Sequence, residues 1–147
     1  MIPPVFVVDT NVLAAGLITK DGISPVTRIV DAMLSGKLIY LISPPLLDEY
    51  RAVLVRPKLN RLHGLSAQEV DLLLTELVSN AIWREPATAV SAPDRGDDHL
   101  WALLAAYSGS ILITGDRLLL DHPPEPASVI SPRTYVDQFW SRGYGGK

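Results

Sequence analysis

Cysteine is absent from the 147 residues of this sequence. Its absence excludes disulfide bonds, thiolate metal sites and thiol nucleophiles, and it fits a protein of the reducing cytosol. The chain also lacks an apolar run long enough to span a membrane, and its start, Met1–Pro4, has no basic segment followed by a long apolar one. We therefore expect a cytoplasmic protein with neither a signal peptide nor a membrane span.

An excess of positive charge is lacking as well. Lysine and arginine number 13 against 16 aspartates and glutamates, which gives a formal net charge of −3. Domains that bind nucleic acid passively are usually basic, because their cations displace counterions from phosphates. The charge argues against tight passive binding, but it is compatible with a nuclease whose acidic site attracts phosphate once a metal is bound.

The hydrophobic content, 48% of the residues, is that of a globular protein with a substantial core. We expect one domain over residues 1–142, followed by a flexible tail over residues 143–147. Apolar and mostly β-branched runs predict strands at Val5–Val8, Leu38–Ile42 and Ile111–Thr114, with weaker candidates at Ile82–Trp83 and Ser128–Ile130.

Helices are predicted between these strands by their start signals. Ser24, Ser43 and Ser131 each precede a proline, so that serine caps the helix and proline occupies its first turn. Ser66–Glu69 forms a capping box, and a further helix is expected over Asp98–Tyr107. The alternation predicts an α/β fold, with a parallel β-sheet flanked by α-helices on both faces in a three-layer sandwich.

Acidic residues follow the predicted strands. Asp9 and Asp116 come directly after two of them, Glu49 lies in the helix after a third, and Asp97 and Asp98 begin another helix. Since ligands bind beyond the carboxyl ends of parallel strands, we expect these acids to meet at one edge of the sheet. Taken singly, each has an ordinary explanation as a helix cap, a turn residue or a surface charge.

Together, the acids predict a metal site. Clustered carboxylates repel one another, whereas Mg²⁺ or Mn²⁺ binds oxygen ligands and removes that repulsion. Such a metal can activate water and neutralise a phosphodiester, so hydrolysis of phosphodiesters is the reaction that suits the pattern best.

Four sequence motifs resemble those of PIN domains, in the same order and over nearly the whole chain. They are Val7–Leu13, Ser43–Leu54 continued by Arg56–Leu59, Asp94–Leu103, and Ile113–Asp116. The most similar subgroup comprises toxins of toxin–antitoxin systems of the VapC type. The resemblance implies a PIN-like sandwich and a Mg²⁺- or Mn²⁺-dependent endoribonuclease acting on single-stranded RNA.

Carried over residue by residue, the resemblance implies that the catalytic metal ligands are Asp9, Glu49, Asp98 and Asp116. Asp97 is the alternative to Asp98, which we prefer for its spacing from the helix that follows. The resemblance also implies a homodimer and a small antitoxin partner.

Thr10 and Asn11 are expected to support Asp9 through hydrogen bonds. The chain departs from the family at Arg95 and Gly96, where relatives often carry proline and an acid, and at Leu118, where many carry a further acid. The number of metal ions therefore stays open.

A basic stretch follows the helix that carries Glu49. Arg51, Arg56, Lys58 and Arg61 are candidates for contacts to the RNA backbone, or for an ordinary solvated helix end with favourable cations. Both interpretations stay open.

The three histidines do not have the spacing of a zinc site, and we expect each to lie on the surface or in a loop. His99 adjoins the acidic pair Asp97 and Asp98, and contact with substrate is a weaker alternative for it.

Two other functions are alternatives to the ribonuclease toxin for this sequence. A non-catalytic RNA-binding or regulatory module on a PIN scaffold is favoured by Leu118 and by the acidic net charge. A phosphatase of the haloacid-dehalogenase type would also place an aspartate after the first strand. Its general acid would stand two residues after Asp9, where this chain has Asn11.

Overall fold

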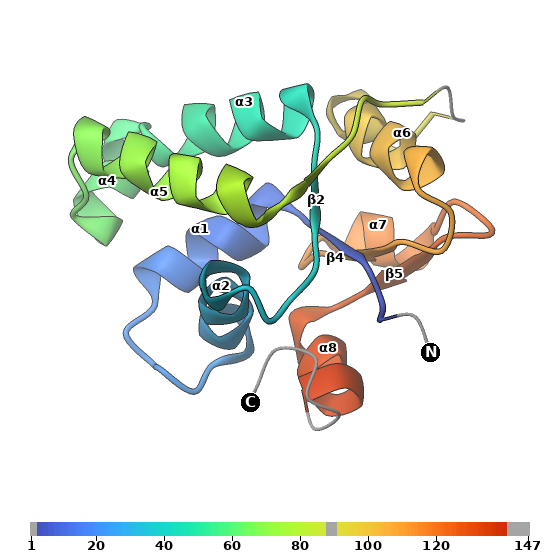
Figure 1. Ribbon diagram of the computed structural model, residues 1–147, viewed down its shortest axis with the longest axis horizontal. Coiled ribbons are helices and arrows are strands. Elements are labelled where there is room, and N and C mark those ends of the chain that lie inside the picture. Colours follow the sequence, from blue (N-terminus) through green and yellow to red (C-terminus); the bar gives the residue numbers. More distant parts are fainter. Residues whose placement is uncertain (1–2, 88–90, 141–147) are drawn as a thin grey trace.

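The computed structural model describes residues 3–87 and 91–140 and has a parallel β-sheet at its centre (Figure 1). Strand β1 pairs with β4, β4 with β5, and β2 with β3, always in parallel. The strands form a three-stranded sheet, β1-β4-β5, and a two-stranded sheet, β2-β3. A parallel bridge between Phe6 and Tyr40 places β2 beside β1, so the strands follow one another in space as β3-β2-β1-β4-β5. The strands are β1 (Phe6–Val8), β2 (Leu41–Ile42), β3 (Ile82–Trp83), β4 (Ile111–Ile113) and β5 (Ser128–Ile130).

Helices surround the sheet and give the predicted α/β sandwich (Figure 1). A short 3₁₀ turn, η1 (Arg95–Asp97), precedes α6. The helices are α1 (Thr10–Ile18), α2 (Pro25–Ser35), α3 (Pro44–Leu54), α4 (Pro57–His63), α5 (Ala67–Asn80), α6 (Asp98–Ala106), α7 (Arg117–Asp121) and α8 (Pro132–Phe139).

Four helices begin as the sequence predicts. The side chains of Ser24, Ser43 and Ser131 each accept a hydrogen bond from a backbone N–H of the first turn, with proline next in the chain. Ser66 and Glu69 form the complete capping box of α5. These local interactions fix the residue at which each helix starts, and therefore the position of the residues just before it.

Three helices were not predicted. Helix α1 contacts α2, α3 and α4, and most of its surface is apolar. It therefore lacks the one-sided apolar pattern by which a surface helix is recognised in a sequence. Helix α4 starts at Pro57 without a side-chain cap, and α7 is a single short helix after Asp116. Strand β2 is shorter than predicted. The tail over residues 143–147 lies outside the described residues.

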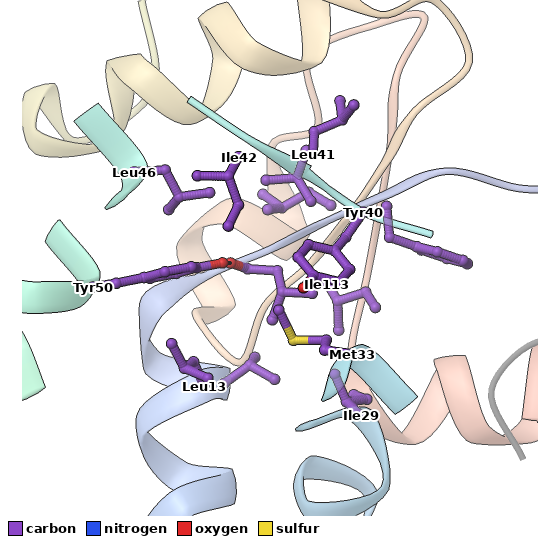
Figure 2. Packing of buried hydrophobic residues seen from close by; sticks show 14 of the residues in the cluster. Leu13, Ile29, Met33, Tyr40, Leu41, Ile42, Leu46, Tyr50 and Ile113 are labelled. Carbon is purple, nitrogen blue, oxygen red and sulfur yellow. Dashed lines mark hydrogen bonds between the residues drawn. The ribbon is translucent and has the colours of Figure 1, made fainter. Parts of the chain in front are cut away.

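The core lies between the sheet and its helices (Figure 2). Two buried tyrosines connect helices and strands through it. The Tyr50 hydroxyl donates a 2.6 Å hydrogen bond to the carbonyl oxygen of Val8, and the Tyr40 hydroxyl donates one of 2.6 Å to that of Leu77. Tyr50 thus reaches from α3 to the end of β1 (Figure 2). Of the helices in the described ranges, none is both long and apolar enough to cross a membrane.

Helices α1 and α2 pack closely at Gly16. A Cβ atom built there would lie 2.4 Å from Cγ2 of Val30 and 2.7 Å from the carbonyl oxygen of Val26. Real Cβ atoms do not approach a backbone oxygen so closely, so only glycine allows this packing of the helix that begins next to Asp9.

We expect Gly16→Ala to lower the free energy of unfolding by about 1–3 kcal/mol, because the overlap outweighs the gain of about 1 kcal/mol in helix propensity. Urea denaturation measures the change. Gly22→Ala is the matched control, since nothing lies within 4 Å of a Cβ at that position. Equal stability of the two variants would contradict the proposed close packing.

Candidate active site at the carboxyl edge of the sheet

Asp9 follows β1 directly and caps α1, and the residue is buried. Oδ1 accepts a 2.7 Å hydrogen bond from the backbone N–H of Thr10, and Oδ2 accepts one of 2.7 Å from the Thr114 hydroxyl. Burial raises the pKa of Asp9, the two hydrogen bonds oppose that change, and the charges of Glu49 and Asp116 add to it. A carboxylate held in this way keeps one orientation.

Asp116 lies close to Asp9 because β4 pairs with β1. Thr114 follows β4, and its hydroxyl accepts a 3.0 Å hydrogen bond from the backbone N–H of Asp116. Asp116 then caps α7, with Oδ1 accepting from the N–H of Leu118 at 2.9 Å. The side chain of Asn11 accepts a 3.4 Å hydrogen bond from the N–H of Gly115, so Asn11 supports the loop that carries Asp116.

Glu49 reaches the same region from α3. Its Oε1 accepts a short hydrogen bond from the Thr10 hydroxyl and lies 3.6 Å from Nε2 of His99. His99 is the main cause that lowers the pKa of Glu49, with Thr10 and the charge of Arg56 acting in the same direction against partial burial. Thr10 therefore supports Asp9 with its backbone and Glu49 with its side chain.

The acidic pair at the start of α6 divides into two roles. Asp98 turns towards the preceding loop, where its Oδ1 accepts a 2.7 Å hydrogen bond from the N–H of Ala92. Burial raises the pKa of Asp97 to about 6, and the negative charges of Asp9, Asp94, Asp116 and Glu49 contribute. Asp97, the alternative ligand, therefore lies close enough to the other acids for their charges to act on it, and Asp98, the preferred ligand, holds the preceding loop through one oxygen.

Four acids from separate parts of the chain thus influence one another, namely Asp9, Glu49, Asp97 and Asp116. The ion pairs seen within residues 3–87 and 91–140 do not join any of the four to arginine or lysine. Asp121, the next acid after Asp116, is paired with Arg117 at 3.7 Å instead.

The four acids offer only carboxylate oxygens to a divalent cation. In the described part of the chain, no three histidine, aspartate or glutamate side chains are placed so that they could already hold one ion together. The chemistry of the set does fit, because carboxylate oxygens are what Mg²⁺ and Mn²⁺ prefer and, among the described residues, no ion pair joins them to arginine or lysine. Burial is the main cause that raises the pKa values of Asp9 and Asp97, and the negative charges of neighbouring acids add to it.

The basic candidates are distributed differently from the acids. Arg51 is engaged by Asp71 of α5, with Nε 2.9 Å from Oδ1. Arg56 is close enough for its charge to lower the pKa of Glu49. Lys58 and Arg61 lie exposed on α4.

His99 is the site residue that sequence reasoning undervalued. Its place in the first turn of α6, next to two aspartates, was visible in the sequence, but its partner Glu49 is distant along the chain. Only the packing of α3 against α6 brings the two together.

We expect Asp97→Asn to stabilise the protein at about pH 8 and to have almost no effect at about pH 4. The pKa of Asp97 is raised from 3.8 to about 6, so the folded chain keeps a proton that the unfolded chain loses. The stability that the Asp97 carboxyl contributes is therefore lost as the pH rises from 3.8 to about 6. Thermal denaturation with EDTA at both pH values measures the difference. Asp31→Asn, on the exposed face of α2, is the control, and a pH-independent effect of Asp97→Asn would refute the expectation.

Comparison with known proteins agrees with the geometry. The PIN domain family model matches residues 5–118. An uncharacterized protein of Methanocaldococcus jannaschii, MJ1680, is 28% identical over 142 residues, which cover 90% of each chain. No solved structure gives a significant match. PIN domains are generally nucleases. With its parallel sheet, its order of motifs and a match over most of its length, the chain belongs to the PIN domain family.

Proposed function

We propose that this protein is a metal-dependent endoribonuclease that hydrolyses phosphodiester bonds of single-stranded RNA. The observation that carries the proposal is that the charges of Asp9, Glu49 and Asp116 act on Asp97, while no ion pair among the described residues joins these acids to arginine or lysine. Gathering these charges opposes folding, so their proximity is best explained by a cation and a phosphate that they serve.

Asp9, Glu49, Asp97 and Asp116 are the residues that would hold Mg²⁺ or Mn²⁺, either directly or through water. When bound, such an ion supplies activated water and neutralises charge on the phosphodiester. Asp9 is preoriented by Thr10 and Thr114. The other three acids come from helix starts or early helix turns, where side chains can adjust to the ion.

The RNA backbone would be contacted by cations beside the acids. Arg56 is the best candidate, because its charge already acts on Glu49, and Lys58 and Arg61 follow it on α4. Arg51 contributes less, since Asp71 engages it. The role as a toxin, a small antitoxin partner and a homodimer are part of the proposal on the strength of the resemblance to VapC-type toxins.

The alternative function is a non-catalytic RNA-binding module. It is favoured by the observation that, among the described side chains, no three potential ligands already surround one point. Titration calorimetry with Mn²⁺ separates the two, because a module of this kind would bind RNA without binding the metal. The phosphatase alternative is weaker, since Asn11 occupies the general-acid position and accepts a hydrogen bond from Gly115.

We expect RNA cleavage that requires Mg²⁺ or Mn²⁺, stops with EDTA, and falls more than about a hundredfold in Asp9→Asn, because losing a ligand costs more than losing a ligand's supporting partner. Gel assays of single-stranded RNA measure it. Asp31→Asn is again the control. Equal cleavage by the wild type and Asp9→Asn, or cleavage that persists in EDTA, would defeat the proposal.

The two neighbouring aspartates should differ. Asp97→Asn removes a charge from the acidic group and should weaken Mn²⁺ binding at least about tenfold. Asp98→Asn leaves an oxygen that still accepts from Ala92, so its Mn²⁺ affinity should stay within about twofold of wild type. Calorimetry on both variants decides, and the reverse order would return the ligand role to Asp98.

A further inference from the structure

We propose that His99 is a positioning residue that fixes the carboxylate of Glu49 for the reaction. This inference rests on the proposed nuclease function and adds a residue that the predicted ligand set does not contain. Nε2 of His99 lies 3.6 Å from Oε1 of Glu49, between helices α6 and α3. The partners come from different helices, so the contact also sets how those helices meet at the site.

One oxygen of Glu49 is held from two sides. The Thr10 hydroxyl, from α1, donates to Oε1, and the His99 ring approaches the same atom from α6. With Oε1 occupied in this way, Oε2 is the oxygen that Glu49 presents to a ligand. The His99 contact is longer than a hydrogen bond, as contacts in catalytic sites often are before substrate binds.

The burial of His99 argues against a role in packing alone. Its side chain is 16% exposed, and within the described residues neither ring nitrogen has a hydrogen-bond partner. Burying polar atoms without partners costs stability, and an apolar side chain would fill the space without that cost. His99 costs the fold stability and lies against Glu49, so its presence is best explained by its effect on Glu49.

The test compares His99→Leu with His99→Gln. Leucine fills the space but cannot donate, so Mn²⁺ affinity measured by calorimetry should fall about 10–100-fold, as for other supporting partners of metal ligands. Glutamine keeps an N–H near the position of Nε2 and should retain affinity within about threefold. The melting temperature of His99→Leu should stay near that of the wild type, because the lost 3.6 Å contact with Glu49 is offset by removing a ring whose nitrogens have no hydrogen-bond partner among the described residues.

A double-mutant cycle shows whether His99 acts through Glu49. In a Glu49→Gln background, His99→Leu should change Mn²⁺ affinity less than about twofold, because the carboxylate that His99 holds is already lost. Independent effects of the two substitutions would overturn the proposal. So would a lower melting temperature of His99→Leu with unchanged Mn²⁺ affinity, since that pattern belongs to a packing residue.

Should His99→Leu not fold, His99→Asn replaces it. Asparagine is too short to place a donor near Glu49, so the same loss of affinity is expected, and wild-type affinity would refute the role.

The failure of the proposed function and the failure of this inference can be told apart. A wild-type protein that binds no Mn²⁺ and cleaves no RNA defeats the proposed function and this inference with it. Metal-dependent cleavage that His99→Leu leaves unchanged defeats only the inference.

Discussion

The hydrogen bond from the Thr114 hydroxyl to Asp9 is the interaction on which the rest of the site depends. It joins the residues that follow two neighbouring parallel strands, and the same hydroxyl accepts from the N–H of Asp116. The loop after β4 is thereby locked to the end of β1. The pairing of β1 with β4 sets the two segments side by side and Thr114 holds both, so Asp116 comes close enough for its charge to act on Asp9.

Charge is distributed unevenly around this fixed point. Glu49 has a neighbouring histidine and the more distant charge of Arg56, which lower its pKa and keep it ionised. Asp9 and Asp97 have negative neighbours instead, and burial raises the pKa of both. At this edge of the sheet added negative charge is therefore unfavourable and a cation is favourable.

Much of this arrangement could be read from the sequence. Apolar runs predicted the strands, and serine–proline pairs gave the starts of α2, α3 and α8, because both signals arise within a few residues of chain. Helices α1, α4 and α7 were missed, since α1 is apolar on most of its surface and α4 and α7, with 7 and 5 residues, are too short to show a helical pattern. The difference between Asp97 and Asp98, and the meeting of His99 with Glu49, depend on how α6 docks, which spacing along the chain does not encode.

The hydroxyl of Tyr50 joins the backbone segments that carry Glu49 and Asp9. It belongs to the residue after Glu49 and donates to the carbonyl of Val8, the residue before Asp9. Helix α3 and strand β1 are thus tied beside both acids by a buried bond that water cannot replace. The backbones of Asp9 and Glu49 are therefore held at a fixed separation, so any adjustment of these two acids to a bound ion falls to their side chains.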